Sequence, residues 1–149
     1  MDEHRWTLRV RAADQGPSTV YARHDQFQVG APLSFDPEYP HVTALEHLLA
    51  ALGADLVGGL QATARRQRLQ ISNIEAVVSG KLNNPLTYLG VVGEEGHPGL
   101  EQVTVTVYVN SLEPEERVRQ AWEEMLKRSP LVHTLKSVVK LDLAVKLVI

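Results

Sequence analysis

The sequence contains no cysteine. Thiolate nucleophiles, disulfide exchange and thiolate-bound metal centres all need this side chain, so each of these chemistries is excluded. The G-x-S-x-G pattern of a serine nucleophile is missing as well, and so are the H-x-x-x-H and H-E-x-x-H spacings typical of zinc sites. The sequence therefore predicts no metal and no cofactor.

An excess of positive charge is also missing. The formal net charge is −3, whereas proteins that bind nucleic acid usually present a net basic face to the phosphate backbone. The segment from Met1 to Val10 carries charges and lacks the continuous apolar stretch of a signal peptide or membrane anchor. We expect neither nucleic acid nor a membrane as a partner, and we expect a cytoplasmic location.

The overall composition is that of an ordinary globular protein. Apolar residues make up 44% of the 149 positions and charged residues 22%. A chain of this length can bury an adequate core without disulfide bonds. We therefore expect one domain that spans residues 1–149.

Polar and apolar residues alternate near the start of the chain. The alternation covers residues 6–10 and recurs around residues 20–22, with Gln15-Gly16-Pro17 between the two segments, which predicts a β-hairpin. Three prolines within residues 30–40 then exclude a helix and disfavour a central strand. We expect a loop there.

A long helix is predicted from Ala44 to about Arg68. Thr43 followed by Glu46 three residues later forms a capping box at its start. The middle of the helix, residues 48–60, is apolar or small on nearly every side, so we expect burial on most faces. Its far end is basic, which complements the helix dipole, through Arg65, Arg66 and Arg68.

The second half of the chain mixes strands with one further helix. Strands are predicted over residues 71–82, 103–109 and 139–147, the last two because apolar residues alternate strictly with polar or small ones. A surface-packed helix begins after Pro114. The expected order is β-β-α-β-β-α-β, an α+β fold around a long central helix.

Two segments together are similar to the OsmC/Ohr family, named for an osmotically inducible protein and for organic hydroperoxide resistance. TALEHLLAALGAD, Thr43 to Asp55, resembles the family's central helix, in which a Glu near the helix start precedes a peroxidatic cysteine by nine or ten residues. SPLVHTL, Ser129 to Leu135, resembles the motif around the family's second cysteine. Asp55 and Ser129 stand at the two cysteine positions.

The resemblance implies an OsmC-like fold in an intertwined homodimer whose active sites lie at the subunit interface. In the family a thiolate reduces an organic hydroperoxide, a Glu and Arg pair assists, and the second cysteine forms a disulfide. Glu46 is the candidate for that Glu, and Arg11 and Arg23 are both candidates for the Arg. Without cysteine the reaction has no nucleophile and no resolving step.

Asp55 is the most informative position, because its neighbours on the helix are apolar or small. A carboxyl group in such a place is a candidate acid or base, although it could also line a polar remnant of the family's site or pair with an Arg at the interface. Glu46 lies nine residues away, on the opposite side of a straight helix. The two carboxylates could meet only across an interface or through a distortion near Gly53, and Glu46 could simply cap the helix.

Ser129 directly precedes Pro130, which is the arrangement of a helix N-cap. Capping is therefore its first expected role. A nucleophilic serine would need an adjacent base, and His133, one helical turn on, is the candidate.

The preferred hypothesis is a non-peroxidase that binds a small apolar molecule in a cavity at the dimer interface. Asp55, Glu46 and Ser129 would orient the ligand, and further contacts would come from Arg11, Arg23 and His133. The alternative is a cysteine-independent enzyme, a hydrolase or a hydroperoxide-handling protein, with Asp55 as acid or base. A third possibility is a vestigial relative in the oxidative stress response.

Overall fold

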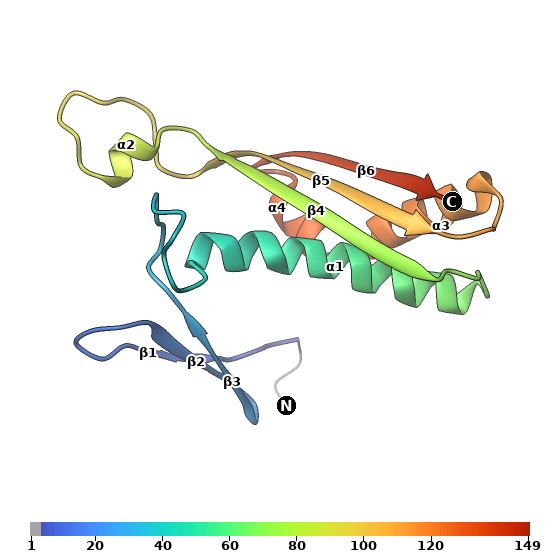
Figure 1. Cartoon of the computed structure of the whole chain (residues 1–149), viewed down its shortest axis with the longest axis horizontal. Coiled ribbons are helices and arrows are strands. Elements are labelled where there is room, and N and C mark those ends of the chain that lie inside the picture. The colour runs from blue at the N-terminus through green and yellow to red at the C-terminus, as the bar shows by residue number, and fades with distance from the viewer. Residues whose placement is uncertain (1–3) are drawn as a thin grey trace. The chain divides into compact units, whose positions relative to one another are not determined.

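The computed structural model describes residues 4–149, so Met1–Glu3 of the predicted charged start lie outside the described residues. The chain divides into two compact units, one up to Leu48 and one from Leu49 to Ile149. Figure 1 shows the N-terminal strands of the first unit and the longer strands of the second. In the described part of the chain, no helix is both long and apolar enough to cross a membrane.

The first unit contains a three-stranded antiparallel sheet of β1 (Arg9–Arg11), β2 (Ser18–Ala22) and β3 (Asp25–Val29) in that order. The predicted hairpin is confirmed as the β1–β2 pair, in which Val10 lies opposite Val20. The prediction missed β3, which pairs with β2 through a tight turn at Arg23. Arg23 has φ 55°, a left-handed conformation that usually needs glycine or asparagine, so the turn carries no sequence signal.

The predicted proline-rich loop is confirmed over residues 30–43, which contain no helix or strand. Two hydrogen bonds join the start of the loop to its end. Gly30 N donates to the Val42 carbonyl (2.7 Å), and Ala44 N donates to the Ala31 carbonyl (3.0 Å). A side chain at Gly30 would lie 2.8 Å from atoms of Tyr39 and His41. The loop is therefore a closed, packed connection into the long helix.

The long helix α1 (Ala44–Arg66) begins with the predicted capping box. Thr43 Oγ1 accepts the Glu46 N–H at 3.2 Å, and Glu46 Oε1 accepts the Thr43 N–H at 3.0 Å and the Thr43 hydroxyl at 2.9 Å. Arg65 and Arg66 lie in the last turn, and Arg68 lies just beyond it with φ 56°. The hydrogen bonds between Thr43 and Glu46 satisfy N–H donors that the first helical turn leaves free.

The second unit is built on a sheet of β4 (Asn73–Leu82), β5 (Leu100–Asn110) and β6 (Lys140–Val148) in that order. The β4–β5 pair is antiparallel and the β5–β6 pair is parallel. Figure 1 shows α1 and α3 (Glu115–Arg128) on one side of this sheet. As the alternation predicted, one face of β5 is buried in the core, through Val103, Val105, Val107 and Val109.

Two short helices were absent from the predicted order. α2 (Pro85–Tyr88) follows β4, and the Asn84 side chain accepts its Leu86 N–H at 3.0 Å. α4 (Pro130–Leu135) follows α3, with Ser129 as its N-cap. Both helices are too short to show a periodic apolar stripe, so only their caps and prolines could have indicated them.

The prediction that α1 is buried on most faces is wrong for the single chain. The residues that α1 buries against the sheet and α3 are Leu52, Gly53, Leu56, Leu60, Thr63 and Ala64. The residues that α1 leaves exposed include Ala50, Ala51, Ala54 and Gly58. Within the second unit, one sheet and one helix cover only one side of the α1 cylinder, and these residues lie on the side that they leave uncovered. We call it the small-residue face.

Candidate functional site

Asp55 and Ser129, the two positions that the sequence resemblance singled out, meet in space. The Ser129 hydroxyl donates a hydrogen bond to Asp55 Oδ2, although the two residues are 74 positions apart in the sequence. Asp55 comes from the middle of α1 and is partly buried, whereas Ser129 lies between α3 and α4 and is 4% exposed. We call this contact the Asp55–Ser129 pair.

The local sequence holds Ser129 in place from both sides. Its N–H donates to the Leu126 carbonyl at the end of α3, and its Oγ accepts the Val132 N–H at 3.1 Å at the start of α4. Pro130 begins α4 because the first helical position needs no N–H donor. The expected capping geometry is therefore present, and the hydroxyl both caps α4 and binds Asp55.

A cavity of about 120 Å³ adjoins the pair. Its walls combine charged, polar and apolar groups, namely Asp55, Gly59, Ala62, Thr63, Arg66, Met125, Arg128, Ser129 and Pro130. Arg66 Nη2 donates to Thr63 Oγ1 at 3.0 Å, and Arg128 Nε donates to Glu124 Oε1 at 3.0 Å. Each guanidinium has five N–H donors, so both arginines keep donors for a bound molecule.

Sequence reasoning missed both arginines. Arg66 follows Asp55 by eleven residues, which at roughly 100° per residue brings it back to the same face of α1. The spacing alone could therefore have indicated Arg66. Arg128 precedes Ser129 directly, but only the folded turn between α3 and α4 decides that its side chain lines the cavity.

Glu46 lies in a different place from the Asp55–Ser129 pair. It lines a separate hollow of about 510 Å³ formed by residues 33–46. The hydrogen bonds from the Thr43 backbone and hydroxyl hold the pKa of Glu46 below its usual value, and the neighbouring His47 lowers it further. The carboxylate is thus committed to capping α1 through Thr43.

The remaining predicted residues each have their own surroundings. Arg11 lies exposed on β1, and Arg23 pairs with Asp25 at 4.0 Å in the β2–β3 turn. No ion pair joins either arginine to Glu46 within residues 4–149. His133 Nε2 lies 2.8 Å from the Lys127 carbonyl oxygen, which can only accept a hydrogen bond. Nε2 of His133 therefore carries hydrogen, and this nitrogen does not serve as a base for Ser129.

The arrangement determines which chemistry the site can offer. The Asp55–Ser129 pair supplies a carboxylate and a hydroxyl, and the cavity adds guanidinium donors and the thioether of Met125. None of these groups can act as a thiolate toward a hydroperoxide. Within the described residues, no group of three or more His, Asp or Glu side chains is placed to hold a metal ion.

The comparisons with known proteins identify the family. The model of the OsmC-like protein family matches residues 36–144, more than half of the chain, so the chain belongs to this family. No curated protein matches it. The predicted OsmC/Ohr membership is therefore confirmed for a chain without cysteine.

Solved structures support the same fold. An OsmC-like protein from Mycoplasma pneumoniae aligns with a TM-score of 0.80 at 21% identity, covering 100% of both chains. The organic hydroperoxide resistance protein OhrB of Bacillus subtilis aligns with a TM-score of 0.59 at 16% identity, covering 95% of this chain and 98% of that one. An organic hydroperoxide resistance protein OsmC from Legionella pneumophila aligns with a TM-score of 0.65 at 9% identity, covering 98% and 99%. The α+β OsmC-like fold is confirmed.

Proposed function

We propose that this chain is a single-domain, homodimeric OsmC-like protein that binds a small, largely apolar molecule and has no peroxidase activity. The observation that carries the proposal is the Asp55–Ser129 pair. It joins the two positions where the family resemblance implies cysteines, and it replaces a redox couple with a carboxylate and a hydroxyl. Such a pair can anchor the polar end of a ligand but cannot cycle between thiol and disulfide.

The size of the cavity supports a site shared between two copies. Its volume of about 120 Å³ within one chain is smaller than the roughly 300 Å³ at which ligand pockets usually begin. A second copy would close the open side and add apolar wall. If Glu46 and Arg11 or Arg23 came from that copy, they would orient the ligand together with Asp55.

The small-residue face of α1 supports the homodimer. Ala51, Ala54 and Gly58 have no large side chains, so a second helix could approach this face closely. A continuous apolar surface of this kind on a monomer usually marks an interaction site. A second copy of α1 packed here would bury the residues that the sequence predicts to be buried.

The alternative function is a cysteine-independent enzyme that uses Asp55 as acid or base. The hydrogen bond from the Ser129 hydroxyl to the Asp55 carboxylate favours it, because a carboxylate in this position could accept the proton of a nucleophilic serine. Against it, Ser129 is 4% exposed and its oxygen already accepts the Val132 N–H. We therefore prefer binding to catalysis.

Native mass spectrometry of gently purified protein tests the proposal. We expect a dimer that carries a bound small molecule, and we expect the Asp55→Ala variant to stay dimeric and to lose the added mass. A dimer without any bound mass, and without thermal stabilisation by small aliphatic compounds, would contradict the binding function. A monomer would contradict the shared cavity.

Turnover assays separate the alternative from the preferred function. We expect no consumption of an organic hydroperoxide and no ester hydrolysis by the wild-type protein. If turnover is found and Asp55→Asn abolishes it, the enzyme hypothesis replaces the binding one. Activity that Asp55→Asn leaves unchanged would come from elsewhere and would support neither role for this residue.

A further inference from the structure

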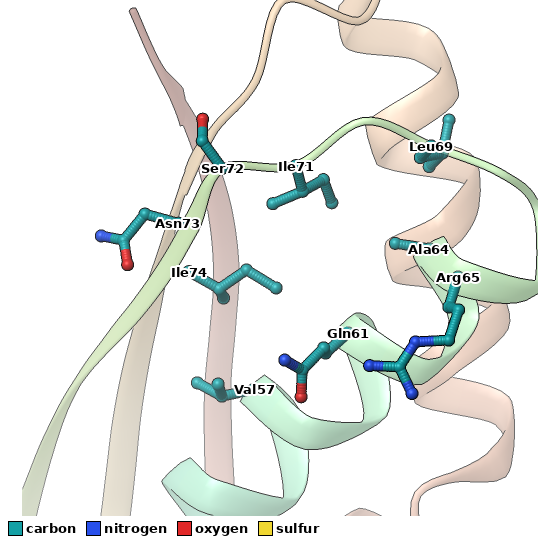
Figure 2. Close-up of a pocket in the computed structure, with 9 residues that line it drawn as sticks. All are labelled: Val57, Gln61, Ala64, Arg65, Leu69, Ile71, Ser72, Asn73 and Ile74. Atoms are coloured by element: carbon teal, nitrogen blue, oxygen red, sulfur yellow. The ribbon is translucent and has the colours of Figure 1, made fainter.

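A larger cavity lies beside a different part of the α1 surface, between the helix and the start of β4. Its volume is about 390 Å³, within the usual range for ligand pockets. Figure 2 shows the side chains of Ile74 in β4 and of Ile71 just before it directed across the cavity toward α1. Its apolar lining consists of Val57, Ala64, Leu69, Ile71 and Ile74.

This cavity is distinct from the Asp55–Ser129 site. Val57, Gln61 and Arg65 recur every four residues along α1 and line it, whereas Asp55, Ala62 and Arg66 line the smaller cavity. At roughly 100° per residue, the centres of the two sets lie about 120° apart around the helix, and the two cavities share no lining residue. A molecule bound in one cavity would not touch the residues of the other.

Two polar side chains of α1 line the larger cavity, across from Ser72 and Asn73 on the strand side. Figure 2 shows the Arg65 guanidinium beside the Gln61 amide. Neither side chain has a hydrogen bond or ion pair within residues 4–149. By contrast, Arg66, Arg117, Arg119 and Arg128 each bond a side chain of the protein. Arg65 thus keeps its full set of donors beside an apolar surface.

We propose that this cavity is a second binding site, for an amphipathic carboxylate such as a medium-chain fatty acid anion. The Arg65 guanidinium would hold the carboxylate through two parallel hydrogen bonds, and the Gln61 amide would add a third donor. The alkyl chain would lie against Val57, Ile71 and Ile74. The site does not depend on the function proposed for Asp55 and Ser129.

Arg65 and Arg68 form a matched pair for the test. Both are exposed and lie three residues apart, but only Arg65 lines the cavity. Decanoate binding to the full-length protein can be measured by isothermal titration calorimetry below the micelle concentration. Because a charged hydrogen bond is lost, Arg65→Gln should weaken decanoate binding about tenfold or more. Arg68→Gln, which removes the same charge, should leave the affinity unchanged.

Further measurements decide where the ligand binds. Decanol, which has the chain but no charge, should bind more weakly than decanoate and should be insensitive to Arg65→Gln. Asp55→Ala should not alter decanoate binding, so the two proposals can fail separately.

Equal effects of Arg65→Gln and Arg68→Gln on decanoate affinity would overturn the proposed site, and so would the absence of decanoate binding. If Arg65→Gln instead weakens self-association, the cavity is an interface between copies and the proposal is wrong.

Discussion

At the scale of single residues, the Asp55–Ser129 pair connects two segments that are distant in the sequence. Ser129 has three hydrogen-bond roles, since its N–H donates to Leu126, its hydroxyl donates to Asp55 and its oxygen accepts from Val132. The pair thereby links the middle of α1 to the turn between α3 and α4. Its hydrogen bonds are reversible and independent of redox conditions, unlike a disulfide.

Ser129→Ala should destabilise the protein by about 1–2 kcal/mol, because it removes the N-cap of α4 and the donor to Asp55 together. Urea unfolding measures the loss. Ser137→Ala is the control, since Ser137 is exposed and makes no hydrogen bond within residues 4–149. Equal stability of the two variants would show that the pair contributes nothing to folding.

Glu46 should make stability depend on pH. Its pKa is lowered by the bonds from Thr43, so the carboxylate's contribution is fully present above the ordinary Glu pKa near 4.5. The contribution is lost as the pH falls through the folded-state pKa. Melting temperatures of wild type and Glu46→Gln between pH 7 and pH 3 test this.

The melting-temperature advantage of wild type over Glu46→Gln should shrink as the pH falls. Glu123→Gln is the control, because Glu123 is exposed and has no bonded partner within the described residues. A difference between wild type and Glu46→Gln that stays constant across the range would contradict the role of the charge in capping.

At the scale of elements, α1 and α3 pack closely because a glycine faces a methionine. A Cβ atom at Gly59 would lie 2.8 Å from Met125 Cγ, and Met125 is 2% exposed, so it has little room to move. The glycine is therefore required by packing, although it costs helix propensity.

Gly59→Ala should destabilise the protein by about 1–2 kcal/mol through overpacking. In a Met125→Ala background the same substitution should instead stabilise the protein, because the obstacle is gone and alanine favours the helix. Chemical unfolding of the four proteins gives the coupling between the two sites. An identical effect of Gly59→Ala in both backgrounds would refute the contact as its cause.

The elements differ in how far the sequence could predict them. The capping box at Thr43 and Glu46 and the alternation of β5 are local patterns, and the structure confirms both. The strand β3 was missed because its turn uses Arg23, a residue with no preference for a left-handed backbone. For the candidate site, two separate sequence segments indicate Asp55 and Ser129, and only the packing of these distant segments brings the two side chains together.

At the scale of the whole molecule, the small-residue face of α1 is exposed to solvent in the single chain, although its residues are apolar. Ala54 is exposed in the middle of this face. If two copies pack their α1 helices here, a long charged side chain at this position would be buried without a partner. Such burial would cost more than the interface could offset.

Ala54→Arg should therefore convert a dimer into a monomer, as measured by size-exclusion chromatography with light scattering. Glu123→Arg, on the exposed side of α3, should leave the dimer intact. The small-residue face would be excluded as the interface if Ala54→Arg stayed dimeric.

The sequence by itself determined the chemistry that the protein lacks and most of its local structure. The absence of cysteine excludes thiol catalysis in any fold, and caps and periodicity depend only on neighbours along the chain. The tertiary structure alone decided that Asp55 and Ser129 share a hydrogen bond, that Arg66 and Arg128 join their cavity, and that α1 leaves one face uncovered. These features depend on how distant segments pack, and packing is a property of the whole core that no local pattern encodes.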